Sequence, residues 1–382
     1  MPRHTALPPE YAVRPFSVRQ AKARGFSKRR LDGADLTAPH RGVRTRHATV
    51  QTVQDQVAAY LPRLLAEQFF SHTTAARLWG LPLPRAFTPA EPLHVATPDR
   101  VNRARTAGVV AHRLTPPTHR VVRVGRVRVG DAVSTWLQLA SILSVEQLVA
   151  VGDALVLDPV HPDREAPAPR PYANPEELRR RVRAFRGPGK RRLVDALELV
   201  RLGVESPKET ELRLLIIRSG MPEPAVNVPV PVQRLSYVPR VDLVYAEWKV
   251  LVEYDGQQHR TDPARFAHDN ARAAALRESG HVLITVLKGG LAGASARAET
   301  AERVRRALLA AGWRPTGNCR EEPALRPKGI RRPQEGAGGR DQEFATAAPQ
   351  EGGGGRDRLS AGGRPIESGG LPTHSEGAPP RV

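Results

Sequence analysis

Cysteine is almost absent from this sequence: its 382 residues include a single one, Cys319. A chain with one thiol builds neither a disulfide framework nor a thiolate metal cage by itself, which suits a reducing compartment. The sequence also lacks an apolar run long enough to span a membrane, and its first residues, MPRHTALPPEYAVRPF, contain no apolar signal-peptide core. We therefore expect a soluble, cytoplasmic protein with no membrane partner.

Acidic residues are also scarce, with 39 Asp and Glu against 59 Lys and Arg, for a formal net charge of +20 and an isoelectric point near 11.1. Such an excess favours a polyanionic partner such as DNA, because each neutralised phosphate releases condensed counterions. An Arg-rich coding bias that decorates the surface produces the same balance. Composition alone does not choose between these two explanations.

Composition and pattern divide the chain into five segments. They are a winged-helix-like unit (1–47), a mixed α/β segment (48–160), a basic Pro/Arg-rich linker (161–190), a candidate catalytic domain (191–315) and a Gly-rich tail (316–382). In the tail, PQEGAGGRD recurs as PQEGGGGRD without apolar periodicity, so we expect disorder there. The Arg run after Asn174 in the linker is either a solvated helix face or a contact to a phosphate backbone. His72 begins a helix in the mixed segment, and we interpret it as a packing or capping residue.

The first segment predicts two short helices followed by a strand or wing. Ser17 and Ser27 are candidate N-caps, Gly25 ends the first helix, and HRGVRT supplies the strand. Helix-turn-helix and winged arrangements of this kind dock on DNA, which would make Arg29 and Arg30 nucleic-acid-binding residues. A small helical cap that happens to be basic is the alternative interpretation.

The candidate catalytic domain predicts the element order α-β-β-β-α-β-α. SPKETELRLLIIRSGM opens with Ser206 as N-cap, Pro207 at the first helical position and Glu209 at the third, a capping box. AVNVPVPV and VPRVDLVY alternate as a hairpin, and WKVLVEYDG reads as a buried strand ended by Gly256. A helix up to Gly280, the strand HVLITVLKGG and a closing helix complete the order.

Three carboxylates interrupt the apolar stretch VDLVYAEWKVLVEYDG. Glu253 and Asp255 emerge on one face because side chains alternate along a strand, and Asp242 lies near the end of the preceding strand. If the two strands are hairpin neighbours, the three groups converge on one edge of the sheet. Buried like charges raise one another's pKa unless something neutralises them. A divalent cation with oxygen ligands, Mg²⁺ or Mn²⁺, does so.

The element order and the Asp–x(10)–Glu–x–Asp spacing resemble the PD-(D/E)xK nuclease superfamily, and most closely the small Vsr-like endonuclease domains known as DUF559. The matching stretches are SPKETELRLLIIRSGMPEP, VDLVYAEWKVLVEYDGQQHR and DNARAAALRESGHVLITV, within residues 205–290. AKARGFSKRRLDGADLTAPHRGVRT is similar to the winged-helix domain of AbiEi-type antitoxins. The resemblance implies an α/β (α+β) fold with a restriction-endonuclease-like αβββαβ core.

The resemblance also implies roles for individual residues. Asp242 matches the first acid of the motif and Glu253 the second, while Asp255 stands where the motif usually has Lys. Mg²⁺ would be held by Asp242 and Asp255, with Glu253 as a ligand directly or through water. Vsr-like enzymes also lack that Lys and use nearby histidines, which makes His259 the best substitute, as general base or phosphate ligand; capping of the following loop is the alternative. Glu209 matches an acid on the first helix that approaches the metal through water, or it serves only the capping box.

Two basic residues complete the expected site. Arg272 is three residues after Asp269 on one helix face, so it forms an intrahelical salt bridge or contacts a phosphate. Lys288, at the end of the last strand, is a further candidate for the missing Lys. The sequence thus predicts metal-dependent hydrolysis of DNA phosphodiester bonds. The alternative is a non-cleaving DNA-binding regulator or antitoxin-like protein with a degenerate nuclease fold.

Overall fold

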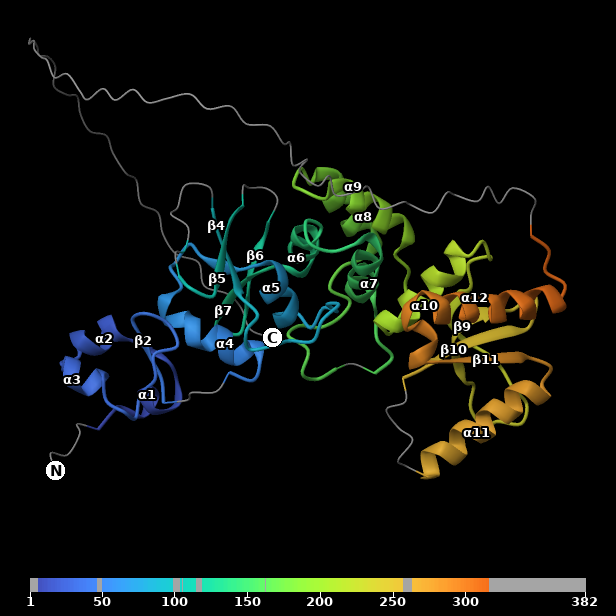
Figure 1. Ribbon diagram of the computed structural model, residues 1–382, viewed down its shortest axis with the longest axis horizontal. Coiled ribbons are helices and arrows are strands. Elements are labelled where there is room, and N and C mark those ends of the chain that lie inside the picture. Colours follow the sequence, from blue (N-terminus) through green and yellow to red (C-terminus); the bar gives the residue numbers. More distant parts are fainter. Residues whose placement is uncertain are drawn as a thin grey trace, which may run out of the picture. The chain divides into compact units, whose positions relative to one another are not determined.

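A computed structural model describes residues 6–46, 50–98, 104, 106–114, 119–161, 163–256 and 263–315, with the backbone alone for 263–266. The predictions for His259 and for the tail (316–382) lie outside these residues. The described chain mixes helices and sheets, as expected for its fold class (Figure 1). None of its helices combines the length and the apolar character needed to cross a bilayer.

The N-terminal segment contains the two predicted short helices and the predicted strand. It also begins with a helix that the sequence does not predict, and the side chain of Ser17 makes no capping hydrogen bond to the helix that follows it. The elements of the segment are α1 (Pro9–Val13), β1 (Phe16–Ser17), α2 (Val18–Ala23), α3 (Lys28–Leu31) and β2 (Val43–Arg44). The two strands pair antiparallel, so HRGVRT does supply a strand. The Ser27 hydroxyl caps α3 by accepting from the Arg30 amide at 3.2 Å, and Gly25 ends α2 at a φ of 86°, where a side chain is disfavoured.

A five-stranded sheet and several helices follow. The strands are β3 (Phe69–Phe70), β4 (Leu93–Pro98), β5 (Val109–Leu114), β6 (Val121–Val124) and β7 (Val127–Gly130), in the order β5-β4-β3-β7-β6. The helices are α4 (Val53–Tyr60), the 3₁₀ turn η1 (Leu61–Arg63), α5 (His72–Leu78), α6 (Ala132–Leu139) and α7 (Val145–Val156). Strands β4 and β5 run parallel. Trp136, Phe70 and Leu148 are fully buried in the core between sheet and helices.

The basic segment expected to be a linker is part of this same core. Helix α8 (Pro175–Ala184) begins at the predicted N-cap Asn174, but it buries Leu178 and Val182 against the preceding helices. Helix α9 (Lys190–Leu199) does the same with Leu193. The expected boundary at residue 191 therefore falls inside a packed helix. The change of core lies in the next helix, where Leu214 belongs to this core and Leu212 to the following one.

The C-terminal unit, which we define as α10 to α12, has the predicted order of elements. They are α10 (Pro207–Arg218), β8 (Ala225–Pro229), β9 (Arg240–Tyr245), β10 (Val250–Asp255), α11 (Pro263–Glu278), β11 (Val282–Leu287), the 3₁₀ turn η2 (Lys288–Leu291) and α12 (Gly293–Ala310). The sheet order is β11-β10-β9-β8. The predicted hairpins β8–β9 and β9–β10 are antiparallel, and β11 joins β10 in parallel after the α11 crossover.

Helices cover both faces of this sheet (Figure 1). Leu212 of α10 and Val304 of α12 pack on one face, and Leu276 of α11 packs on the other. Along β10, Val252 faces the first layer and Leu251 faces α11. Side chains alternate along a strand, so Glu253 projects on the α11 face together with Leu251.

Candidate acidic site and its surroundings

The β9–β10 hairpin brings Asp242 and Glu253 together. The pairs Tyr245 with Val250 and Leu243 with Val252 set a register whose next step places Glu253 opposite Asp242. At that step the Tyr254 amide donates to a side chain and not to a backbone carbonyl of β9. Its acceptor is Oδ2 of Asp242, at 2.7 Å. The part of the prediction that depended on hairpin neighbours is thus observed for these two acids.

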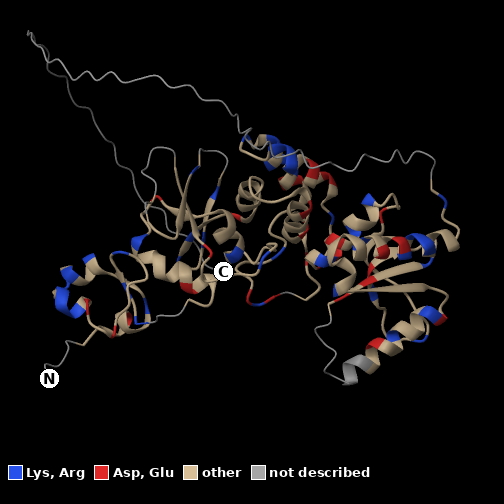
Figure 2. Cartoon of the chain, in the orientation of Figure 1, with Lys and Arg blue, Asp and Glu red and all other residues tan. Residues whose placement is uncertain are grey.

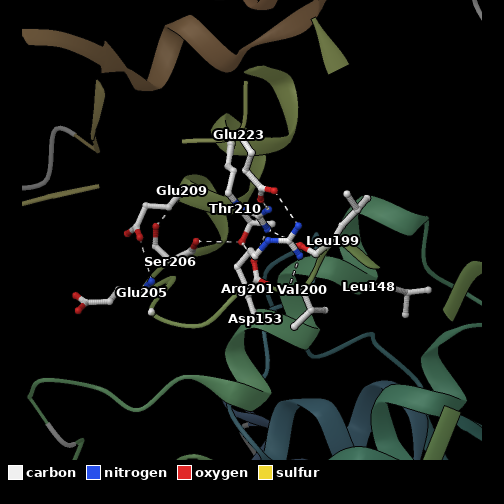
Figure 3. Close-up of polar contacts among 12 residues, drawn as sticks. Leu148, Asp153, Leu199, Val200, Arg201, Glu205, Ser206, Glu209, Thr210 and Glu223 are labelled. Carbon is white, nitrogen blue, oxygen red and sulfur yellow. Dashed lines mark hydrogen bonds and ion pairs between the residues drawn. The ribbon is translucent and has the colours of Figure 1, made fainter. Parts of the chain in front are cut away.

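Glu209 reaches the same region from the first turn of α10. Its amide donates to the Ser206 hydroxyl at 3.2 Å, which is half of the predicted capping box. The other half is different: Oε2 of Glu209 accepts from the Glu205 amide at 3.0 Å and from the Asn227 side-chain amide at 2.7 Å. Figure 3 shows Glu205, Ser206 and Glu209 in this arrangement. The carboxylate of Glu209 is therefore aimed into the sheet and does not close the cap.

Asn227 makes this contact possible through an unusual backbone. It lies within β8 at a φ of 49°, between two residues that pair regularly, Val226 with Leu243 and Val228 with Val241. The left-handed conformation disfavours most residues but suits Asn, whose short amide tolerates it. Since Asp242 lies between those two pairing partners, the interruption of β8 falls directly across from it.

The three acids are coupled electrostatically. Burial is the main reason that the pKa of Asp242 rises to about 7, and the negative charge of Glu209 and then that of Glu253 add to the increase. The Tyr254 amide and the positive charge of Arg272 act in the opposite direction. Burial likewise raises the pKa of Glu209. Such perturbed carboxyl groups gather at functional sites more often than elsewhere.

Arg272 has a different partner from the predicted one. Its guanidinium binds Glu253 with two nitrogens, Nη1 at 3.0 Å from Oε2 and Nη2 on Oε1, and Nη2 also donates to the Arg240 carbonyl at 2.7 Å. The expected partner Asp269 lies 3.8 Å from the His268 ring. The intrahelical pairing is therefore wrong, and the guanidinium expected to contact a phosphate is held by Glu253.

The other predicted residues are only partly assembled. Asp255 is partly buried and ends β10, where it lies opposite Leu287 of β11. Lys288, which is exposed, directly follows Leu287 in the chain. Within the described ranges, His72, His94 and His112 are the one group that brings three ligand atoms within 4.8 Å of one another. By this measure neither the expected set, Asp242, Glu253 and Asp255, nor the acids Asp242, Glu253 and Glu209 form such a group; Glu209 and Glu253 act on Asp242 through their negative charge.

The two arginines of α3 differ sharply. Arg29 is exposed, as a DNA contact requires. Arg30 is buried, with 5% of its side chain accessible, and its Nη1 and Nη2 bind the two carboxylate oxygens of Asp35 at 2.9 Å each. The expectation that Arg30 binds nucleic acid is therefore corrected, because its guanidinium is already satisfied inside the unit.

A buried polar network joins α10 to α7. Asp153 of α7 accepts from the Arg201 amide at 2.7 Å, from the Thr210 hydroxyl at 2.8 Å and from Nη2 of Arg213 at 3.2 Å. Nη1 of Arg213 binds Glu223 at 2.8 Å. Figure 3 shows Asp153, Thr210, Arg201 and Glu223 gathered here. Because Thr210 directly follows Glu209 in the chain, this network fixes the helix turn that carries the third acid.

Comparison with known proteins gives no functional name. No protein-family model matches the chain, and no solved structure matches it. Two curated proteins of Mycobacterium tuberculosis, MT2308 and Rv2248, are similar to it, and both are described as uncharacterized. Each is 29% identical over 102 residues, which is 26% of this chain and 37% of the relative. The chain thus spans little more than a third of the length of the curated relatives it matches.

Proposed function

We propose that the protein binds DNA and that its C-terminal unit hydrolyses phosphodiester bonds with the help of Mg²⁺ or Mn²⁺. The supporting observation is the group of acids around Asp242, whose pKa of about 7 reflects burial beside Glu209 and Glu253. Repulsion of this kind is relieved when a cation binds between the carboxylates. The proposal agrees with the resemblance of this region to Vsr-like endonuclease domains.

The donor set fits a hard divalent cation. Glu253 is neutralised by Arg272, whereas the hydrogen bonds to Asp242 and Glu209 described above come from neutral amides. Mg²⁺ uses one or two carboxylates and completes its shell with water and phosphate oxygens. Asp242 would hold the cation, Glu209 would approach it through water, and Asp255, on the same face of β10, would add a ligand at the open end of the strand.

The cation, when bound, polarises the scissile phosphate and lowers the pKa of a bound water. The chain itself orients these groups. Tyr254 holds one oxygen of Asp242 through its amide, and Asn227 fixes one oxygen of Glu209. Arg272 keeps Glu253 in a single orientation by binding both of its oxygens.

Positive charge is available for holding the nucleic acid. Figure 2 shows Lys and Arg on α3 and along the α8–α9 segment. On α8, the side chains of Arg179, Arg180 and Arg183 are 55%, 59% and 68% exposed, so they are accessible to a phosphate backbone. Arg29 and Lys288 are exposed as well. Contacts of this kind position DNA without reading its sequence.

A plasmid-nicking assay tests the proposal. The full chain should convert supercoiled DNA to nicked circles in Mg²⁺ or Mn²⁺, and the Asp242→Asn variant should lose this activity while keeping the acceptor for the Tyr254 amide. Glu247→Gln removes an exposed acid from the β9–β10 turn and is the matched control, with activity unchanged. Cleavage that persists in Asp242→Asn, or that needs no divalent metal, would contradict the proposed site.

Two observations favour a second function, a DNA-binding regulator that does not cleave. Glu253, the second acid of the motif, is already paired with Arg272, and Asp255 stands where the motif usually has Lys. For this function, the wild-type chain binds duplex DNA in a salt-dependent manner and yields no products even with Mn²⁺. The nicking assay combined with a binding measurement therefore separates the two functions.

A further inference from the structure

Three histidines from different parts of the chain meet beside the five-stranded sheet. His72 is the first residue of α5, His94 lies in β4 and His112 in β5. Because β4 and β5 run parallel with Ala96 opposite His112, the two strand histidines are diagonal neighbours on one face. Each of the three rings offers a nitrogen within 4.8 Å of those of the other two.

The rings contact one another directly. Nδ1 of His94 lies 2.8 Å from Nε2 of His112, and the ring planes differ by 16°, which describes two imidazoles sharing one proton. His72 stacks on His112 with its centroid 3.6 Å away and its plane tilted by 21°. The cluster is thus a hydrogen-bonded pair with a third ring on its face.

Polar neighbours hold the histidines in place. The Ser71 hydroxyl lies 3.0 Å from Nδ1 of His72, and the His72 amide donates to Oε1 of Gln138 at 3.0 Å. The His94 amide donates to the Thr74 hydroxyl at 2.8 Å. Outer contacts of this kind orient histidine ligands at metal sites.

The backbone of His72 is strained. Its φ of 47° is a left-handed conformation, which is uncommon for a residue with a side chain. Gln138, itself buried, helps to hold it there through the amide contact. Strain of this kind is retained where the surrounding structure fixes a side chain for a function.

Burial favours the neutral form of two of the rings, His72 and His94. His72 is 6% exposed, and burial, reinforced by the neighbouring rings, lowers its pKa to about 2. Burial also lowers the pKa of His94. Neutral imidazole has the lone pair that binds a metal, so these rings need not lose a positive charge before they coordinate.

We propose that His72, His94 and His112 form a binding site for a late first-row divalent metal, with Zn²⁺ as the representative ion. Imidazole nitrogens suit Zn²⁺ and its neighbours, whereas Mg²⁺ prefers oxygen. Three protein ligands leave the fourth tetrahedral position for water or another small ligand, the arrangement of zinc sites that are not closed. This site is distinct from the acidic site and independent of the function proposed for it.

Metal binding requires three local adjustments, the first of which is that the two facing nitrogens move apart. Zn–N bonds of about 2.0–2.1 Å in a tetrahedron set nitrogen–nitrogen separations near 3.4 Å, wider than the 2.8 Å between His94 and His112. The proton shared by this pair must move to an outer ring nitrogen, so that both facing nitrogens are bare. His72 must turn about its Cβ–Cγ bond out of the stack, because a metal lies in the plane of each ring it binds.

Zinc titration of the full chain without an affinity tag tests the site. After EDTA treatment and buffer exchange, isothermal calorimetry at neutral pH should show one Zn²⁺ per chain, and the melting temperature should rise with Zn²⁺. Loss of an outer contact is expected to weaken metal binding about 10–100-fold, and His94→Ala, which removes a ligand, should weaken it by more than that. Ser71→Ala, which removes such a contact, should fall within that range.

Two controls keep the result specific. His268→Ala removes a histidine with a 59% exposed side chain, and Asp242→Asn removes the proposed ligand of the acidic site. Both should bind Zn²⁺ as the wild type does. Binding that is absent from the wild type, survives in His94→Ala or disappears in Asp242→Asn overturns the proposal. If His94→Ala does not fold, Co²⁺ added to the wild type decides, since three nitrogen ligands in a tetrahedron give intense visible absorption and a polar core without metal gives none.

Discussion

At the scale of single residues, Asp242 couples the acidic site to pH. Its pKa rises from 3.8 in the unfolded chain to about 7 in the folded one, so the folded state holds the proton more tightly. The stability of the wild type should therefore decrease as pH rises from about 4 to about 7. Asp242→Asn removes this loss, and we expect it to be more stable than the wild type at pH 8, by up to about 4 kcal/mol.

Thermal unfolding of both proteins at acidic and alkaline pH measures this difference. Below pH 4 the Asp242 carboxyl is protonated in both states, so the advantage of Asp242→Asn should vanish there. Glu247→Gln, which changes an exposed acid, should follow the wild type at every pH. An Asp242→Asn variant less stable than the wild type at pH 8 would show that its charge is already compensated within the chain.

Sequence periodicity predicted the part of the acidic site that depends on strands. Alternation in β10 and the hairpin with β9 were enough to place Glu253 beside Asp242. It did not predict the binding of Arg272 to Glu253, which are 19 positions apart, because a helix pattern does not show which strand residue its side chains meet. The cluster of His72, His94 and His112 is not predicted for the same reason. The sequence indicates only a packing or capping role for His72, whereas β4–β5 pairing brings two other rings to it.

At the scale of secondary-structure elements, the order within the C-terminal unit was readable because each helix and strand carries its own period and caps. The boundary before it was not. Helix α8 has its apolar residues Leu178 and Val182 four apart, a core-facing stripe, but its Arg-rich composition favoured a solvated linker. Arg181 resolves the conflict, since it is buried and bound to Asp131 at 3.0 Å and to the Ser134 hydroxyl at 2.6 Å.

The contact between α7 and α10 gives an element-scale prediction. Arg213 is fully buried and paired with Asp153, whose pKa is raised to about 6 by burial, in spite of the opposing effect of Arg213. Arg213→Met leaves that carboxylate without a cation, so we expect a loss of about 3–5 kcal/mol at pH 8. The loss should be smaller at pH 5, where Asp153 binds a proton and is neutral.

Calorimetric unfolding at the two pH values checks this prediction. Arg218→Met is a matched control, because Arg218 of α10 also pairs with an acid of α7, Glu146, but the two side chains are 47% and 40% exposed. That exposed pair should contribute less than about 1 kcal/mol. Equal losses for the two variants, or a loss for Arg213→Met that does not depend on pH, would contradict the assigned role of the buried pair.

At the scale of the whole molecule, the net charge of +20 is the feature that sequence alone left open between DNA binding and surface decoration. The structure divides the arginines that produce this charge into two groups. Some form ion pairs inside the fold, and others face solvent. On α3, Arg30 belongs to the first group and Arg29 to the second. Exposed charges that bind phosphates release counterions, and paired internal ones do not.

This distinction leads to a prediction about salt. If the chain binds duplex DNA through phosphates, its affinity measured by fluorescence anisotropy should fall steeply between about 50 mM and 200 mM salt. Arg29→Ala should weaken binding to all sequences alike and lower the slope of log affinity against log salt by about 1.

Arg30→Ala should instead destabilise the N-terminal unit, because it leaves Asp35 without its main partner. Arg306→Ala, with a 67% exposed side chain on α12, is the control for removal of any positive charge, with an unchanged slope. Affinity that is insensitive to salt, or an equal change of slope for Arg29 and Arg306, would mean that the basic balance of the chain only decorates its surface.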